Sequence, residues 1–356
     1  MKTVLILPPA GSLLCQMECP NSYYARPKVI ELERMQPHIA QFMMNYWTRS
    51  IHPGRQIKIY NFKNVFVGFE GLVFDENGGL IDCTRTLHSE AEVDLAAQSL
   101  ATSRQRENIE TIPKAILAKS RGAENYGHFI IEMLTRAWFA RQHPDLREWP
   151  ALLHRSPPAL QAVSIEALQQ AGYGSDQILI RDGTPIHVRE LVFVDGLAHH
   201  AYYLSPYVMQ CLDAIADGVP AGGAEQIYVP RRPSPTRDFV AEDRVAAALG
   251  GLGFTEVVAG VSSLREQIAA FKGAGTVVGP MGAALTNIAF CKPGTDVFLF
   301  MPSTALEVLF WMIAQARRLN YLEIRCREVG PQTGMLPWDR ALDVDPRAML
   351  DILGGR

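Results

Sequence analysis

The segment 118–136, AKSRGAENYGHFIIEMLTR, holds the first residues whose types and spacing could do chemistry. Asn125 is a natural N-cap, because its side-chain oxygen can accept hydrogen bonds from first-turn amides. Three, seven and eleven residues later come His128, Glu132 and Arg136, so these polar groups share one face of an otherwise apolar helix. Buried polar groups must be paired or must face a cleft. The segment therefore predicts either a local pair or a site.

His128 and Glu132 stand four residues apart and can hydrogen-bond to each other on a helix. A carboxylate beside an imidazole raises the pKa of the imidazole and fixes its tautomer, which would give a positioned base. The alternative is structural, with Asn125 only capping the helix and the other two residues forming a local pair. The sequence leaves both interpretations open.

A second candidate is the segment 276–290, TVVGPMGAALTNIAF, where a predicted strand leads through a glycine turn into a helix. Amides and the macrodipole at a helix N-terminus favour a phosphate, and Gly279 and Gly282 would allow its close approach. The alternative is that these glycines serve only strand-to-helix packing. Neither the dinucleotide glycine pattern nor a P-loop is present in the chain, which argues against NAD enzymes and P-loop NTPases.

Arginines form the third candidate. The predicted strand 226–229 is followed by Arg231 and Arg232. This is the carboxyl edge of the predicted sheet, where open α/β domains bind ligands, and guanidinium groups suit phosphate oxygens. The alternative is a solvated charged turn.

Further along, Thr304 and Glu307 have the spacing of a capping box, although Glu307 could also accept hydrogen bonds from a ribose diol.

The elements that must position these residues are clearest in the last third of the chain. Short β-rich runs alternate there with helical ones, which predicts right-handed βαβ units and a buried parallel sheet in a Rossmann-like domain. The predicted strands are 226–229, 254–258, 276–279, 296–300 and 321–326, and the predicted helices are 239–249, 263–273, 284–290 and 306–319.

The first two hundred residues predict a second, more decorated α/β domain. Helices are expected over 90–103, 126–141 and 158–171, and a connecting helix over 199–216. We expect the chain to divide into an N-terminal α/β domain (1–216), a linker of small residues (217–225), the Rossmann-like domain (226–329) and a tail that packs back on the body (330–356).

Composition limits the function classes. The chain has 356 residues, 48% of them hydrophobic and 20% charged, which fits two globular domains. Its 34 basic and 37 acidic residues argue against binding of nucleic acid through a basic surface. No apolar run approaches a membrane span, so we expect a cytoplasmic protein that is at most peripheral to a membrane. Six dispersed cysteines without a C-x-x-C pair predict buried, reduced thiols and not a disulfide framework.

Three blocks, taken in order, resemble glycosyltransferase family 61, which includes capsular-polysaccharide-type enzymes of bacteria. The family pattern N-Y-x-H-W-x-x-D-x-x-P-R is similar to residues 125–136, and its S-R-R after a strand resembles residues 228–232. The family loop G-x-H-G-A-G-L-T-N resembles residues 279–287, and C-K-P-G-T-D-V follows at 291–297. The similarity covers roughly residues 60–326.

This resemblance implies transfer of a sugar, with inversion, from a nucleotide-sugar donor to a hydroxyl of a glycan or glycoconjugate. It also implies two Rossmann-like domains facing a cleft, the arrangement called GT-B, with the acceptor on the N-terminal domain. On this basis we assign catalysis to His128 and Glu132 as a coupled pair, and expect support from Asn125, Arg136 and Glu307. No metal or other cofactor is then required. We expect the donor phosphates at Arg231, Arg232, Gly279, Gly282, Ala283, Thr286 and Asn287.

Three positions depart from the family pattern. Met281 replaces a histidine and cannot titrate, Glu132 replaces an aspartate, and Thr135 replaces a proline. These departures keep a rival interpretation open, a non-catalytic nucleotide-sugar-binding or assembly protein of a polysaccharide locus. The sequence does not determine the donor sugar and base, the acceptor or the oligomeric state.

Overall fold

The computed structural model describes residues 3–107, 109–200, 202–231 and 236–354. The chain forms two compact units. Unit 1 consists of Met1–Pro20 and Gly54–Ile215, and unit 2 consists of Asn21–Pro53 and Ala216–Arg356. Each unit contains a sheet and helices, so the predicted α/β class is confirmed.

The sheet of unit 1 is mixed. Its order is β1-β8-β7-β6-β12-β9-β10-β11, with β2 also paired to β6. β12, β9, β10 and β11 run parallel, whereas β6 pairs antiparallel with β12, β7 and β2. The antiparallel strands therefore depart from the Rossmann-like domain that the family resemblance implies for this unit. The strands are β1 (Leu5–Ile6), β2 (Leu13–Glu18), β6 (Gln56–Val67), β7 (Val73–Phe74), β8 (Leu80–Ile81), β9 (Thr111–Leu117), β10 (Ala151–His154), β11 (Ile178–Arg181) and β12 (Ile186–Asp195).

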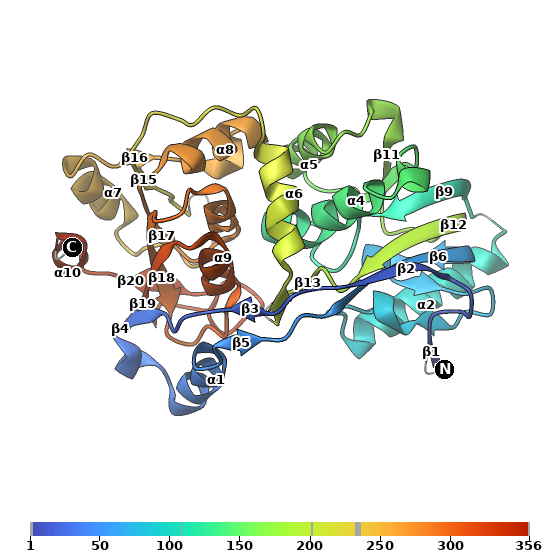
Figure 1. The fold of residues 1–356 in the computed structure, drawn as a ribbon. Coiled ribbons are helices and arrows are strands. Elements are labelled where there is room, and N and C mark those ends of the chain that lie inside the picture. Colours follow the sequence, from blue (N-terminus) through green and yellow to red (C-terminus); the bar gives the residue numbers. More distant parts are fainter. Residues whose placement is uncertain (1–2, 108, 201, 232–235, 355–356) are drawn as a thin grey trace. The chain divides into compact units, whose positions relative to one another are not determined.

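Helices cover both faces of this sheet (Figure 1). On one side, α2 (Glu90–Gln105) begins with a capping box at Ser89 and packs against β7 and β8. On the other side lie α4 (Leu134–Arg141) and α5 (Pro158–Gln170). The connecting helix predicted from residue 199 begins only at Pro206, as α6 (Pro206–Ala216). The residues before it form a short antiparallel pair, β13 (Ala198–His199) with β14 (Tyr203–Leu204).

Unit 2 contains the parallel sheet that the sequence predicts. Its order is β16-β15-β17-β18-β19-β20, and all of these strands run parallel except β20 at the edge. Buried apolar runs form the central strands, as expected for a sheet covered on both faces. The strands are β15 (Gln226–Tyr228), β16 (Thr255–Glu256), β17 (Thr276–Pro280), β18 (Asp296–Pro302), β19 (Asn320–Val329) and β20 (Ala341–Asp343).

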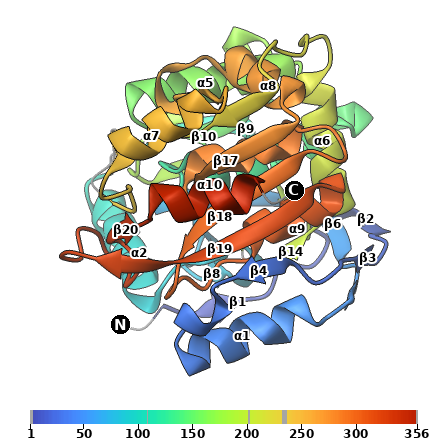
Figure 2. The ribbon, with the colours of Figure 1, turned by 90° about the vertical axis from the view of Figure 1, so that its left-hand side faces the viewer.

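One face of the unit 2 sheet is covered by α7 (Glu242–Gly251) and α10 (Pro346–Gly354), which share a hydrophobic core with the strands (Figure 2). The other helical elements of this βαβ series are α8 (Leu264–Gly273), η8 (Ala283–Phe290) and α9 (Leu309–Arg317). The predicted helix over 284–290 is thus present as η8, but as a 3₁₀-helix.

Residues 21–53 lie in unit 2, although the sequence analysis placed them in the N-terminal domain. In this segment, β4 (Lys28–Ile30) pairs parallel with β19. The following helix α1 (Pro37–Trp47) buries Trp47, whose ring lies 5.6 Å from the guanidinium carbon of Arg325. This pairing joins residues almost three hundred positions apart, so local sequence patterns carry no signal for it.

None of the helices in the described part of the chain is both long and apolar enough to span a membrane. All six cysteines are free thiols. Cys19, Cys211, Cys291 and Cys326 are buried as predicted, whereas Cys15 is exposed and Cys83 is only partly buried.

Candidate functional site

The polar segment of unit 1 begins with the predicted cap. Asn125 Oδ1 accepts hydrogen bonds from the amides of Gly127 at 2.8 Å and His128 at 3.4 Å, which confirms its N-cap role. After α3 (Tyr126–His128) the chain forms a π-helical turn, η4 (Phe129–Met133), before it continues as α4. Single π-helical turns are frequent at functional sites because they redirect side chains within a helix.

The two predicted partners, four residues apart, are in contact. The Nδ1 atom of His128 lies 3.2 Å from Oε1 of Glu132. Glu132 is only 3% exposed, whereas the His128 side chain is 18% exposed. Burial raises the pKa of Glu132, but the hydrogen bond and charge of His128, together with Arg136, outweigh burial and lower it overall. Glu132 is therefore ionised at neutral pH and can orient the imidazole.

A third side chain, His200, joins this pair, and the sequence analysis missed it. Its ring centroid lies 4.4 Å from that of His128. His128, Glu132 and His200 each offer a ligand atom within 4.8 Å of the others, and two imidazoles with one carboxylate are a donor set that could hold Zn²⁺. His200 follows Glu132 by 68 positions, so no local spacing links the two residues.

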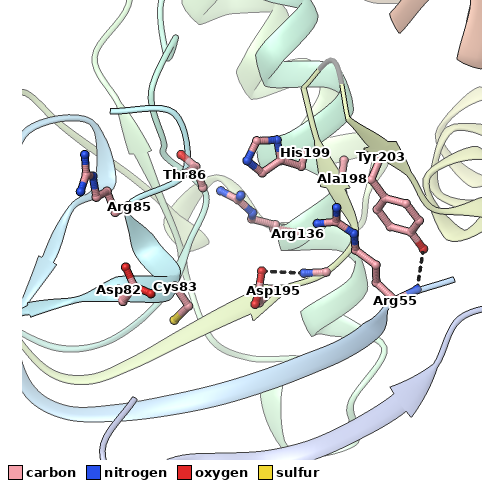
Figure 3. Close-up of a pocket in the computed structure, with 11 residues that line it drawn as sticks. Arg55, Asp82, Cys83, Arg85, Thr86, Arg136, Asp195, Ala198, His199 and Tyr203 are labelled. Atoms are coloured by element: carbon pink, nitrogen blue, oxygen red, sulfur yellow. Dashed lines mark hydrogen bonds between the residues drawn. The ribbon is translucent and has the colours of Figure 1, made fainter. Parts of the chain in front are cut away.

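Arg136, one turn further along, lines a cavity of about 180 Å³ in unit 1 (Figure 3). Its guanidinium carbon lies 5.2 Å from the centre of the Phe193 ring. Most of the lining was not predicted, because it comes from strand ends and loops far apart in the sequence. The lining residues are Arg55, Asp82, Cys83, Arg85, Thr86, Arg136, Asp195, Gly196, Ala198, His199 and Tyr203.

Unit 2 has a separate cavity of about 200 Å³ where β15, β16 and β17 end. The strand order reverses between β15 and β17. After β15 the chain adds β16 on one side of it, and it then crosses to the other side to add β17 and β18. Open α/β sheets bind ligands at such a switch point, outside the carboxyl ends of the strands. The lining residues are Val229, Pro230, Arg231, Val258, Ala259, Gly260, Pro280, Gly282, Ala283, Ala284 and Leu285.

Arg231 holds the loops of this cavity together. Its Nη1 donates to the carbonyl of Met281 at 3.1 Å, and its Nη2 donates to Oγ1 of Thr236 at 3.1 Å. Burial and the neighbouring Arg237 lower the pKa of Arg231 to about 10, so the guanidinium stays charged at neutral pH. Arg231 therefore combines a structural role with a positive charge at the cavity wall.

The predicted glycines make room for protein atoms. A Cβ at Gly282 would lie 2.3 Å from Nη1 of Arg231, and a Cβ at Gly279 would lie 2.7 Å from the carbonyl oxygen of Val229. Gly282 thus allows the guanidinium to reach the Met281 carbonyl, and Gly279 allows β15 and β17 to approach. Gly279 is therefore explained by packing alone, which is the alternative interpretation given above. Gly282 leaves room for the Arg231 side chain and also lines the cavity.

The other predicted phosphate-binding residues divide into two groups. Ala283 lines the cavity, at the first position of η8. Thr286 and Asn287 are buried, and the side-chain Nδ2 of Asn287 donates to Oε1 of Gln267 at 2.8 Å. Neither residue is among the described residues of the cavity wall. Arg232 lies outside the residues that the structure describes.

The predicted capping box at Thr304 and Glu307 is wrong. The helix α9 begins only at Leu309, whose amide donates to Oε1 of Glu307 at 2.7 Å. Thr304 instead donates to Oε1 of Glu328 at 2.5 Å. Residues 303–308, between β18 and α9, are thus not helical. Neither Thr304 nor Glu307 is among the described residues that line the cavity of unit 2.

Comparison with known proteins shows which family part of this chain is similar to. No curated protein matches the chain. The family model of glycosyltransferase 61 matches residues 126–298, from the start of α3 into β18. The matched segment contains the His128–Glu132 pair of unit 1 and all the lining residues given above for the cavity of unit 2. Residues 126–298 of this chain are therefore similar to glycosyltransferase 61, which supports a glycosyltransferase.

Proposed function

We propose that this protein transfers a sugar from a nucleotide-sugar donor to a hydroxyl of a glycan or glycoconjugate, with inversion, in bacterial polysaccharide or glycoconjugate synthesis. The observation that carries the proposal is the His128–Glu132 hydrogen bond inside the segment matched by glycosyltransferase 61. The proposal includes a GT-B arrangement, which the parallel sheet of unit 2 and the parallel part of the unit 1 sheet support.

The proposed reaction is a direct displacement. The acceptor oxygen forms a bond to the anomeric carbon while the bond from that carbon to the donor phosphate oxygen breaks. The acceptor proton goes to the coupled pair of His128 and Glu132, and the nucleoside diphosphate leaves with the electron pair. A positioned base of this kind contributes about 10²- to 10⁴-fold to the rate.

The donor phosphates are assigned to unit 2. Arg231 supplies a permanent positive charge at the cavity wall, and Ala283 and Ala284 supply amides at the start of η8. The first amides of a helix have no partner within the helix and can donate to phosphate oxygens. Such preorganised donors stabilise the charge that develops on a departing phosphate. Asn125 and Arg136 support the base from unit 1.

The test uses a panel of nucleotide-sugars and free nucleotides. A nucleotide that binds is expected to raise the melting temperature, since ligand at 100 times its dissociation constant adds about 2.7 kcal/mol to stability. The matching nucleotide-sugar should release free nucleotide, at least by slow hydrolysis. Arg231→Lys should weaken both effects, whereas Arg327→Lys, an exposed position on β19, should not. Absence of stabilisation and release across the panel would contradict the proposal.

Met281 favours a second candidate, a non-catalytic nucleotide-sugar-binding or assembly protein. This residue replaces the family histidine and is only 3% exposed, with its amide donating to the Phe300 carbonyl at 2.8 Å. It cannot assist the donor chemically. Stabilisation by nucleotide-sugars without any release of nucleotide would support this candidate over the transferase.

A further inference from the structure

We infer that the cavity around Arg136 in unit 1 binds an anionic group, a carboxylate or a phosphate, carried by the acceptor sugar. That the bound sugar is the acceptor rests on the proposed function. The inference deepens that function, because it names the acceptor class as an acidic glycan. The binding itself can be tested without any transfer reaction.

The first argument is the state of Arg136. Its side chain is only 4% exposed, and its Nη1 is buried without a hydrogen-bond partner among the described residues. Among the described residues Arg136 forms no ion pair within 4.0 Å, and the charges of Glu132 and Asp195 act on it from further away. A buried guanidinium without a close counter-ion is costly, and the Phe193 ring at 5.2 Å offsets only part of this cost. An anion in the adjoining cavity would supply a counter-charge to this guanidinium.

The second argument is that other basic side chains line the same cavity as Arg136. Arg55 and His199 line the same cavity, and Figure 3 draws both beside Arg136. The guanidinium of Arg55 stacks 5.0 Å from the ring centre of Tyr203, which holds this exposed side chain in place. Two guanidinium groups offer the planar donor pairs that bind carboxylate and phosphate oxygens.

The remaining lining groups fit the rest of a sugar. The wall carries three arginines and two aspartates, Asp82 and Asp195, among its described residues. Asp195 already accepts a hydrogen bond from the Gly196 amide at 2.8 Å, which fixes its carboxylate. Carboxylates accept hydrogen bonds from sugar hydroxyls, whereas the arginines select the acidic substituent. The mixed wall is therefore suited to an acidic sugar rather than to a simple ion.

Size and position agree with an acceptor ring. The cavity measures about 180 Å³, and a cavity of about 150 Å³ in another protein accepts a benzene ring. Arg136 follows Glu132 by four residues, which is about 6 Å along a helix. A sugar held at Arg136 thus lies one helical turn from the proposed base, within unit 1.

The experiment compares three probes that differ at one carbon: glucuronate, glucose 6-phosphate and glucose. Binding is measured by saturation-transfer NMR on the full chain. At least one acidic probe should bind about 10-fold or more tightly than glucose, because charge-assisted hydrogen bonds are worth about 1.5–3 kcal/mol. The tighter acidic probe tells whether the natural substituent is a carboxylate or a phosphate.

Variants assign the preference to the cavity. Arg136→Gln and Arg55→Gln should each reduce it toward equal binding, while Arg136→Lys should keep part of it. Arg189→Gln, an exposed position on β12 outside the cavity wall, is the matched control and should bind like wild type. Arg55 is exposed, so its variant tests the inference even where substitution of buried Arg136 prevents folding.

Equal binding of all three probes, no binding of any of them, or a preference that survives Arg55→Gln would overturn the inference. These results leave the proposed function standing if nucleotide-sugars still release nucleotide. Conversely, a selective acidic-sugar site in a chain that neither binds nor cleaves nucleotide-sugars supports the inference and contradicts the transferase.

Discussion

The Nδ1 atom of His128 lies 3.2 Å from a carboxylate oxygen of Glu132, with the carboxylate almost completely buried and the imidazole partly exposed. A neutral imidazole that donates its Nδ1 proton to the carboxylate presents Nε2 as the basic atom. The exposed fractions favour His128 as the group that meets an acceptor hydroxyl. Glu132 then orients the ring and stabilises its charge after proton transfer, as a carboxylate does for the histidine of a catalytic triad.

Two glycine variants should separate packing from binding in unit 2. Gly282→Ala places a Cβ against the end of the Arg231 side chain, which can move. We expect it to displace the guanidinium and weaken nucleotide binding by about 10-fold, the value of one charged hydrogen bond, with a small change in melting temperature. Titration of nucleotide into both proteins measures this change. Unaltered affinity would show that Arg231 does not bind the donor.

Gly279→Ala is the matched comparison. Its Cβ would meet the carbonyl oxygen of Val229, the residue directly after β15. The amide of Val229 donates to the Val278 carbonyl at 2.8 Å, so this backbone cannot move freely. Overpacking of this kind costs about 1–3 kcal/mol. Chemical denaturation should therefore show a clear loss of stability for Gly279→Ala. A stability equal to that of Gly282→Ala would contradict the packing role.

Acid should destabilise unit 1 through His88. Burial lowers the pKa of this histidine to about 4, whereas the unfolded chain binds the proton near 6.5. The contribution of His88 to stability is therefore constant above about pH 6.5 and falls between about 6.5 and 4, by up to about 3 kcal/mol, because only the unfolded state gains the proton there. Urea denaturation at several pH values should show this slope in wild type and a flatter one in His88→Gln. Identical slopes would contradict a buried neutral His88.

Metal removal tests the alternative use of the His128, Glu132 and His200 cluster. The proposed mechanism uses fixed arginine and amide charges, so nucleotide release should be unchanged after dialysis against EDTA. Elemental analysis of the purified protein accompanies the assay. Loss of release that Zn²⁺ restores in wild type but not in His200→Ala would instead make the cluster a catalytic metal site.

The sequence predicts those parts of the fold that local patterns determine. The alternation of strands and helices in unit 2 and the cap at Asn125 are present because each depends on residues a few positions apart. The π-helical turn at 129–133 leaves no such pattern, since the segment reads as an ordinary helix. The placement of residues 21–53 with β19 depends on a pairing that no local periodicity encodes.

The candidate site follows the same division. The His128–Glu132 contact was predictable from a spacing of four residues. His200, Arg55 and Asp195 come from distant strands and loops, and only the folded sheet of unit 1 brings them to Arg136 and His128. In unit 2, Gly282 was assigned to a ligand because a glycine turn shows that something approaches closely, and the sequence does not reveal that Arg231 does so.

The most direct test of the account is the rate of nucleotide release by Glu132→Gln on the nucleotide-sugar that wild type cleaves. The amide keeps the size of the carboxylate but not its charge. Glu124→Gln, at an exposed position one residue before Asn125, is the control. We predict a rate about 10²- to 10⁴-fold below wild type for Glu132→Gln and a normal rate for Glu124→Gln, with both proteins folded. A Glu132→Gln protein that turns over at the wild-type rate would contradict the proposed reaction centre.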